Sequence, residues 1–166
     1  MKRYISLWIL TICFGSFGQE LPPIMKFSPT TYKAGNQNWM ISQDKNKFLF
    51  FANNEGLLEH NGTDWLLYPT PNETIIRSVK IIQDKIYTGC YMDFGYWKRA
   101  SNGILEYTSL TPKIKSKILD DEQFWNILEF GKWVVFQSLN QIFIYDTQTE
   151  NFQIVNPKNP IFKAYV

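Results

Sequence analysis

The sequence predicts an all-β fold built from a repeated, four-stranded unit. The chain of 166 residues is 17% aromatic, with 6 Trp, 9 Tyr and 13 Phe, and aromatic rings are enriched in strands. Short apolar runs alternate with polar turns, and outside residues 1–18 no stretch of about twelve residues or more has helical periodicity. Similar segments also recur along the chain, which is typical of repeat architectures.

The repeat is clearest around Trp39 and Trp125, each of which opens an apolar segment. Gly56-Leu57-Leu58-Glu59-His60 is matched by Gln141-Ile142-Phe143-Ile144-Tyr145, and Gly103-Ile104-Leu105-Glu106-Tyr107 aligns with both as the second copy. The mean period of about 43 residues is the length of a four-stranded propeller blade. The sequence therefore predicts three blades of a β-propeller, at about 38–70, 76–119 and 123–156.

The chain ends before such a ring could close. After Pro157 and Pro160 it begins an apolar run near residue 161, which we expect to be the first strand of a fourth blade. Known propellers have about four to eight blades. We therefore expect an incomplete propeller over 38–166, preceded by an extended lead-in segment at 19–37. Three blades by themselves would leave two outer sheet faces open.

Residues 1–18 have the features of a signal peptide. Lys2-Arg3 is followed by an apolar run at 4–14 and by small residues before a cut at Gln19. The apolar run is too short to span a bilayer comfortably. Acylation of Cys13, as in a lipoprotein, is a less suitable alternative because a bulky residue precedes it. The sequence thus predicts an exported protein.

The charge pattern excludes a nucleic-acid-binding role for this segment. The net charge is +2, from 17 Lys and Arg against 15 Asp and Glu, and it falls close to zero once the signal peptide is removed. The one dense basic run has Lys113, Lys115 and Lys117 alternating with other residues. This period of two predicts a strand with one solvated face.

Polar segments between the apolar runs predict turns. Residues 43–47 and 146–151 are such segments, and Asp44 and Asp84 share one turn position in two repeats. Asn61-Gly62 predicts a type I′ hairpin turn, which needs left-handed backbone at both central residues.

No catalytic residue, metal site or cofactor is expected. His60 is the only histidine, and its alignment with Tyr107 and Tyr145 predicts a packing or strand-end role. Cys90 would be the only cysteine of the mature chain, so neither zinc-ligand spacing nor a nucleophilic triad can be assembled. The acidic cluster Asp120-Asp121-Glu122 is expected in a turn between blades, because adjacent carboxylates do not suit glycosidase geometry.

One segment of the second copy, between Gly89 and Gly103, departs from the other copies and is rich in aromatic residues. Insertions in repeat proteins often form the binding face, and rings with an acid suit a carbohydrate. Alternatively, the segment lengthens a hairpin and packs against a neighbouring blade. Trp39 and Trp125 begin the innermost strands of their blades. They either face the central funnel, where a ligand could bind, or pack in the core. The candidate ligand-binding residues are Tyr91, Asp93, Phe94, Tyr96, Trp97, Trp39 and Trp125.

Several motifs identify a family resemblance over nearly the whole mature chain. They are Leu21-Pro22-Pro23-Ile24, Phe27-Ser28-Pro29, Gln37-Asn38-Trp39, Asn53-Asn54-Glu55-Gly56, Phe94-Gly95-Tyr96-Trp97 and Asp121-Glu122-Gln123-Phe124-Trp125. The chain resembles the two-component-regulator propeller proteins of Bacteroidetes bacteria. The motifs belong to the repeat rather than to catalysis, so they point to the architecture more than to the chemistry.

The resemblance implies a periplasmic sensor anchored in the inner membrane. Such proteins have two propellers, a small β-sandwich with a triple-tyrosine motif, a membrane-spanning helix and a cytoplasmic output, either a LuxR-type helix-turn-helix or a histidine kinase. It also implies a glycan or other small extracellular ligand, a homodimer in the full-length protein and membrane attachment through a downstream helix. Two other functions stay open, a secreted protein-interaction scaffold and a propeller glycan hydrolase or lyase that uses carboxylates such as Asp93.

Overall fold

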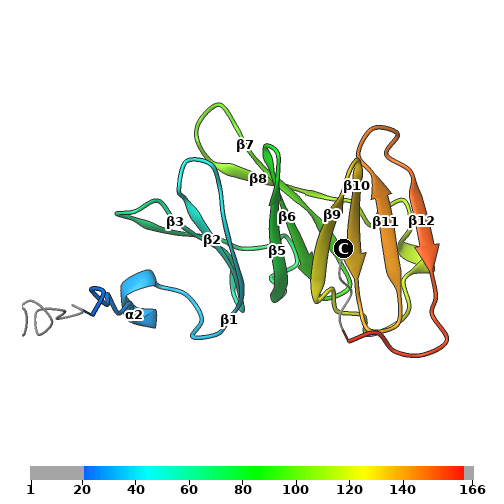
Figure 1. The fold of residues 1–166 in the computed structure, drawn as a ribbon, viewed down its shortest axis with the longest axis horizontal. Coiled ribbons are helices and arrows are strands. Elements are labelled where there is room, and N and C mark those ends of the chain that lie inside the picture. The colour runs from blue at the N-terminus through cyan, green and yellow to red at the C-terminus, as the bar shows by residue number, and fades with distance from the viewer. Residues whose placement is uncertain (1–20, 163–166) are drawn as a thin grey trace, which may run out of the picture.

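The computed structural model describes residues 21–162, which form three four-stranded antiparallel sheets, here called blades 1, 2 and 3 (Figure 1). Blade 1 contains β1 (Asn38–Gln43), β2 (Leu49–Asn53), β3 (Gly56–His60) and β4 (Trp65–Tyr68). Blade 2 contains β5 (Ile76–Ile82), β6 (Lys85–Cys90), β7 (Phe94–Arg99) and β8 (Leu105–Ser109). Blade 3 contains β9 (Asn126–Phe130), β10 (Trp133–Gln137), β11 (Ile142–Asp146) and β12 (Phe152–Val155).

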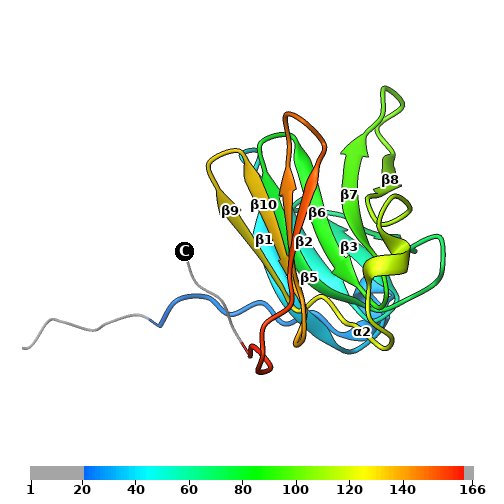
Figure 2. The ribbon, with the colours of Figure 1, turned by 90° about the vertical axis from the view of Figure 1, so that its right-hand side faces the viewer.

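Within each sheet, neighbouring strands follow one another in the chain. The first strands, β1, β5 and β9, lie side by side, and the later strands extend away from them (Figures 1 and 2). This arrangement confirms the predicted all-β, partial-propeller fold in the described part of the chain. Because the first strands of three sheets converge, residues at equivalent positions of different blades can meet there.

The alignment of the second repeat is wrong by one strand. The predicted repeat matches residues 103–107 with residues 56–60, which form β3. In the structure, Leu105–Ser109 is instead β8, the fourth strand of its blade. The third strand is β7, which pairs with β6 as β3 pairs with β2. The aromatic segment after Gly89 is therefore a regular blade strand, and the extra length lies between blades 2 and 3, at residues 110–125. The proposed equivalence of His60 with Tyr107 is lost with this alignment.

The predicted turns at 43–47 and 146–151 are confirmed, and aspartate side chains close them. Oδ1 of Asp44 accepts hydrogen bonds from the backbone N–H groups of Asn46 and Phe48, at 2.8 and 2.9 Å. Asp146 accepts two backbone N–H groups of its own turn in the same way. Such local side-chain hydrogen bonds explain why aspartate recurs at these positions.

The connection between β3 and β4 is longer than the predicted type I′ turn. His60 pairs with Trp65, which leaves residues 61–64 as the loop. Gly62 has a left-handed backbone with φ of 99°, but Asn61 does not. Instead, Oδ1 of Asn61 accepts the backbone N–H groups two and three residues further on, at 2.9 and 2.7 Å. The side chain of Asn61 thus stabilises a four-residue loop in place of the two-residue turn.

The largest core lies between blades 2 and 3 and is centred on Phe94 of β7. Its side chain is 0% exposed. The ring stacks on Phe136 with centroids 4.2 Å apart and meets the ring of Phe124 edge-on at 4.7 Å. Phe143 and Phe152 lie further out, with centroids at 5.4 and 6.0 Å. Rings of one blade therefore interdigitate with rings of the next.

A second core joins blades 1 and 2. Trp97 is 3% exposed, packs near Tyr68 with ring centroids 6.1 Å apart, and donates its indole N–H to Oγ1 of Thr88 at 3.0 Å. An ion pair also crosses this boundary, because Nη2 of Arg99 lies 2.7 Å from Oε1 of the buried Glu59. Both inner cores thus use residues of β7, the strand whose position the sequence alignment misses.

The lead-in segment covers the outer face of blade 1. It contains one short helix, α2 (Pro29–Tyr32), so it is not extended throughout. Tyr32 and Ala34 are buried against this face, and the ring of Tyr32 lies 5.5 Å from that of Trp65. One of the two faces expected to be open is therefore covered. The outer face of blade 3 keeps exposed apolar side chains, including Phe130 and Val155.

The basic run after β8 is not a strand. Lys115–Lys117 forms a 3-10 helix, and Ile114 and Ile118 are buried in the core between blades 2 and 3. The two isoleucines flank this single turn and point inward, while the three residues between them are exposed. In a strand, Ser116 would share the buried face of the isoleucines, so its exposure distinguishes the turn from the predicted strand.

Two expectations concern residues outside the described range. The signal peptide at 1–18, including Cys13, is one of them, and most of the expected first strand of a fourth blade is the other. At the edge of the described range, the N–H of Ile161 donates to the carbonyl oxygen of Leu139 at 2.7 Å. The carbonyl oxygen of Ile161 accepts a hydrogen bond from Nε2 of Gln137 at 2.9 Å.

Candidate functional site

Each blade contributes one large side chain at the start of its first strand. The pairing of β1 passes from Asn38 to Met40, so Trp39 lies in a bulge, and Arg77 lies in the corresponding bulge of β5. Trp125 directly precedes β9 in blade 3. Because a bulge re-aims its side chain, residues of three separate sheets can converge. We call Trp39, Arg77 and Trp125 the Trp–Arg–Trp cluster.

The guanidinium of Arg77 contacts both indoles of this cluster. Its central carbon is 4.3 Å from the ring centroid of Trp39 and 4.7 Å from that of Trp125. The two indoles also contact each other edge-on, with centroids 5.7 Å apart and planes at 76°. A cation over an aromatic face is worth about 0.5–2 kcal/mol, so the two rings hold the guanidinium in place.

Two amide side chains fix the orientation of the cluster. The indole N–H of Trp39 donates to Oδ1 of Asn54 at 2.7 Å, and Nε of Arg77 donates to Oε1 of Gln123 at 2.6 Å. Burial lowers the pKa of Arg77 from its ordinary value, and no carboxylate of residues 21–162 forms an ion pair with it. The site thus offers one uncompensated cation with two aromatic neighbours.

The sequence predicts two of the three cluster members. Trp39 and Trp125 are candidates from the repeat, and the structure brings them together. Arg77 is missed because the second repeat is aligned on the wrong strand. Alignment of β7 with β3 would have placed Arg77 at the position of both tryptophans. The supporting Gln123 is unremarkable in sequence, because it contacts Arg77 only through the fold.

Of the other candidate residues, only Tyr91 lies beside the cluster. It forms an isolated β-bridge with Gln123, and its side chain is 42% exposed. Phe94 and Trp97 are buried between blades, which agrees with the alternative that this segment packs against its neighbours. Tyr96 packs at the edge of the core between blades 2 and 3, where Nζ of Lys85 lies 4.2 Å from its ring centroid.

Asp93 is buried rather than presented to a ligand. Its side chain is 8% exposed and accepts hydrogen bonds from three hydroxyl groups. They belong to Tyr107 at 3.0 Å, Ser109 at 2.6 Å and Thr111 at 2.6 Å. The carboxylate therefore connects β7 with β8 and the following loop, and it has no open route to a sugar hydroxyl in this structure.

The fold has counterparts among solved structures. Two similar structures are extracellular domains of the B. thetaiotaomicron protein BT4673, which is described as a proposed one-component system in one case and a proposed hybrid two-component system in the other. Each matches with a TM-score of 0.56, at 18% and 19% identity over 75% and 74% of this chain. The chain shares the fold of these extracellular domains. It spans 16% of the length of each.

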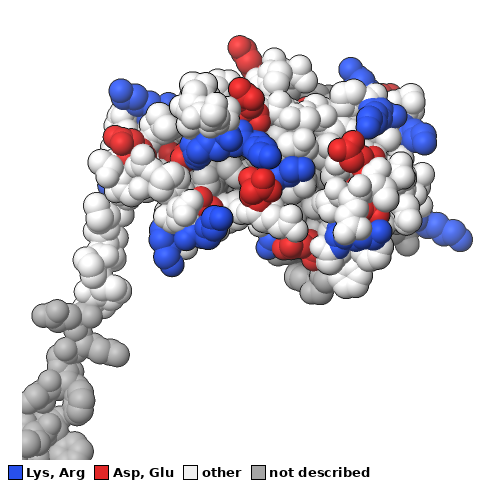
Figure 3. Space-filling model, turned by 90° about the horizontal axis from the view of Figure 1, so that it is seen from above, with Lys and Arg blue, Asp and Glu red and all other residues white. Residues whose placement is uncertain are grey.

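This similarity confirms, at the level of fold, the resemblance to regulator propellers. No protein-family model matches the chain, and no curated protein is significantly similar to it in sequence. In residues 21–162, no helix has the length and apolarity needed to cross a membrane. Positive and negative side chains are interspersed on the face seen in Figure 3, without a large area of one sign.

Cys90 lies next to Asp93 in the interior and should be unreactive in the folded protein. Burial, reinforced by the nearby carboxylate of Asp93, raises the pKa of its thiol to about 12. Since the thiolate is the reactive form, little of it exists near about pH 8. In a Cys13→Ser variant, we expect a disulfide reagent to label Cys90 slowly in buffer and rapidly in denaturant. Rapid labelling of the native chain would contradict this burial.

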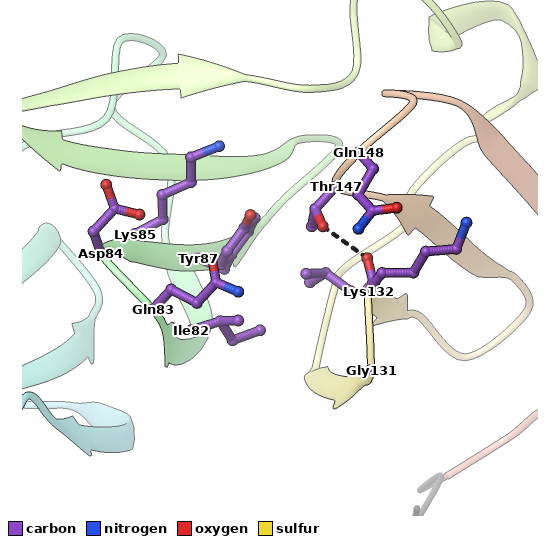
Figure 4. Close-up of a pocket in the computed structure, with 10 residues that line it drawn as sticks. Ile82, Gln83, Asp84, Lys85, Tyr87, Gly131, Lys132, Thr147 and Gln148 are labelled. Carbon is purple, nitrogen blue, oxygen red and sulfur yellow. Dashed lines mark hydrogen bonds between the residues drawn. The ribbon is translucent and has the colours of Figure 1, made fainter.

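A groove of about 460 Å³ lies between the turns of blades 2 and 3 (Figure 4). Gln83 and Asp84 form one wall, and Lys132 and Thr147 form the other, where Oγ1 of Thr147 donates to the carbonyl oxygen of Lys132 at 2.8 Å. A groove of about 210 Å³ lies between the equivalent turns of blades 1 and 2. Its recurrence indicates that the groove follows from blade geometry.

Of the charged residues that line this groove, Lys132 and Asp84 form ion pairs, and Nζ of Lys85 lies over the ring of Tyr96 at 4.2 Å. Lys132 donates to the carboxylate of Asp146 at 2.7 Å, which lowers the pKa of that carboxyl to about 2. Lys98 and Asp84 form a second, exposed pair at 3.5 Å. The Trp–Arg–Trp cluster, with its unpaired cation, is therefore the stronger candidate site.

The remaining polar candidates have structural surroundings. His60 ends β3, and its ring stacks on that of Trp65 with centroids 4.1 Å apart. Asp120 and Asp121 lie in the turn before β9, as expected, and Asp121 has a left-handed backbone with φ of 63°. Glu122 is buried and accepts a hydrogen bond from Asn140 at 2.8 Å. Residues 21–162 contain no group of three or more potential metal ligands.

Proposed function

We propose that this chain is part of the ligand-sensing ectodomain of a signal-transduction regulator and that this segment is not catalytic. The shared fold with the extracellular domains of BT4673 supports the proposal, because those domains belong to a regulatory system. In this view the signal peptide exports the chain to the periplasm, and a downstream helix attaches it to the inner membrane. The output would be transcriptional or a kinase, and the full-length protein would be a homodimer.

The observation that carries the proposal is the Trp–Arg–Trp cluster. Its three residues come from three different blades, and they meet where the first strands converge. A ligand held there would contact all three sheets at once. Binding would therefore favour one relative placement of the blades over others, which is what a sensor needs in order to pass on a signal. Exposed tryptophan beside polar groups also suits a glycan.

The test is direct binding of oligosaccharides to the purified chain. A ligand that binds only the folded state raises the melting temperature, so a panel of neutral and acidic glycan fragments can be screened by thermal shift. We expect stabilisation by at least one member, and loss of it in Trp125→Ala. The matched control is Trp133→Ala, which removes another tryptophan of blade 3 outside the cluster. If no glycan fragment of the panel raises the melting temperature, the sensing proposal loses its support.

A secreted protein-interaction scaffold is the second candidate. The exposed apolar side chains on the outer face of blade 3, Phe130 and Val155, favour it. A gene that encodes neither a membrane helix nor an output domain downstream would support this alternative. A hydrolase or lyase would require a carboxylate other than Asp93, whose oxygens are engaged by three hydroxyl groups.

A further inference from the structure

We infer that the Trp–Arg–Trp cluster recognises a sugar ring that carries a carboxylate, with the carboxylate on Arg77 and the ring against Trp39. This inference rests on the proposed sensing function and specifies the ligand class for the same site. It starts from the one unusual electrostatic feature of the cluster, a positive charge without a counter-charge.

The terminal nitrogens of Arg77 are free to bind a ligand. Nε donates to Gln123, and the guanidinium carbon lies 4.3 and 4.7 Å from the ring centroids of the two indoles. In residues 21–162, no side chain or carbonyl group accepts from the two terminal nitrogens, and the one buried polar side-chain atom without a partner is Oε2 of Glu59. The terminal nitrogens of Arg77 are therefore unpartnered and reach solvent.

The geometry of this free edge matches a carboxylate. A guanidinium presents parallel N–H groups that bind the two oxygens of a carboxylate together. Contact with the indoles and the hydrogen bond from Nε already restrain the guanidinium, so little side-chain freedom is lost when a ligand binds. The cluster contains a single cation, which complements one negative charge better than a dianionic phosphate.

Trp39 supplies the neighbouring surface for a ring. It is 39% exposed, and its indole is held by the hydrogen bond to Asn54. A hollow of about 230 Å³ has Trp39, Ile41 and Phe51 among its walls. This volume is below the range of about 300–1,000 Å³ of drug-sized sites, so it suits a single small ring. Since Arg77 stacks on the same indole, a carboxylate attached to that ring lies within its reach.

The groove between blades 2 and 3 is less suited to such a ligand. Its lining cations are Lys132, which is bound by Asp146, and Lys85, whose Nζ lies over the ring of Tyr96 at 4.2 Å. A ligand carboxylate would have to displace those partners. At Arg77 it would instead provide the counter-charge that the described residues lack.

The experiment is a titration followed by NMR of the ¹⁵N-labelled chain, with the indole N–H signals of the tryptophans and the Nε–H signal of Arg77 as reporters. The probes are D-glucuronate, D-glucose, acetate and sulfate. Glucuronate should shift the signals of Trp39 and Arg77 saturably and bind about tenfold or more tightly than each other probe, because a hydrogen-bonded ion pair adds to ring stacking.

Three variants make the test specific. Arg77→Gln should weaken glucuronate binding by about tenfold or more, and Arg77→Lys should give an intermediate loss, since it keeps the charge but not the paired donors. Lys80→Gln, an exposed residue of the same strand, is the matched control and should bind normally. If Arg77→Gln does not fold, the test rests on Arg77→Lys. That variant should bind glucuronate more weakly while the rest of its NMR spectrum shows a folded chain.

The possible outcomes separate the two proposals. Equal binding of glucose and glucuronate would overturn recognition of the carboxylate while leaving a sensing function in place. Equal binding of sulfate would overturn the choice of a carboxylate-bearing ring. An unchanged affinity for glucuronate in Arg77→Lys, followed at the indole N–H signal of Trp39, would overturn paired hydrogen bonding. Absence of binding by every probe and by the whole oligosaccharide panel would overturn both the inference and the proposed function.

Discussion

Replacement of Phe94 by alanine should destabilise the fold by about 3–5 kcal/mol, the cost of emptying a buried aromatic site. Its ring is fully buried and stacks on Phe136 at 4.2 Å, with Phe124 edge-on at 4.7 Å. Truncation would leave a cavity at the centre of the core that joins blades 2 and 3. Because blades are stabilised mainly by their neighbours, this loss should affect both sheets.

The measurement is urea unfolding of the wild-type chain and two variants, monitored by tryptophan fluorescence. The matched control is Phe130→Ala, because Phe130 is 56% exposed on the outer face of blade 3. That control should cost less than about 1 kcal/mol. Equal midpoints for Phe94→Ala and Phe130→Ala would contradict the packing of blade 2 on blade 3.

Replacement of Asp93 by alanine is expected to cost about 3 kcal/mol or more, because it leaves buried hydroxyl donors without an acceptor. The carboxylate accepts from Tyr107, Ser109 and Thr111, and Tyr107 is itself deeply buried, which raises the pKa of its hydroxyl. Asp93→Asn keeps one acceptor oxygen and should therefore fall between the wild type and Asp93→Ala.

Thermal and urea unfolding of both Asp93 variants would measure this cost. Asp84→Ala is the matched control, since the side chain of Asp84 is 63% exposed and contacts only the exposed Lys98 at 3.5 Å. Small stability changes in Asp93→Ala, combined with loss of ligand binding, would show instead that Asp93 acts at the binding site. The result thus separates a structural carboxylate from a ligand-binding one.

The fold is predictable from sequence because its signals are local and repeated. Turn-forming residues such as Asp44 and Asp146 accept hydrogen bonds from their own turns, so their role does not depend on the rest of the molecule. Alternating apolar residues between those turns define strands. Three copies of such a pattern identify a blade architecture even when individual strands are misaligned, as happens with residues 103–107.

The errors occur where a short pattern is compatible with two structures. The lysine run at 113–117 alternates like a strand, yet Lys115–Lys117 forms a 3-10 helix in which Ser116 is exposed together with the lysines beside it. Asn61-Gly62 is suited to a two-residue turn, yet the pairing of the flanking strands leaves a four-residue loop. In both places the competing structures differ little in local energy, so packing of distant residues decides between them.

The sequence by itself determined the class of fold and the repeat that marks Trp39 and Trp125 as equivalent, and it predicts an export signal at 1–18. The tertiary structure decided which candidates lie in the core, as Phe94 and Trp97 do, and which residue joins the tryptophans. Arg77 becomes part of a site only when three first strands converge. The reason is that turns and strands are set by neighbouring residues, whereas a site assembled from three sheets depends on contacts between residues far apart in the chain.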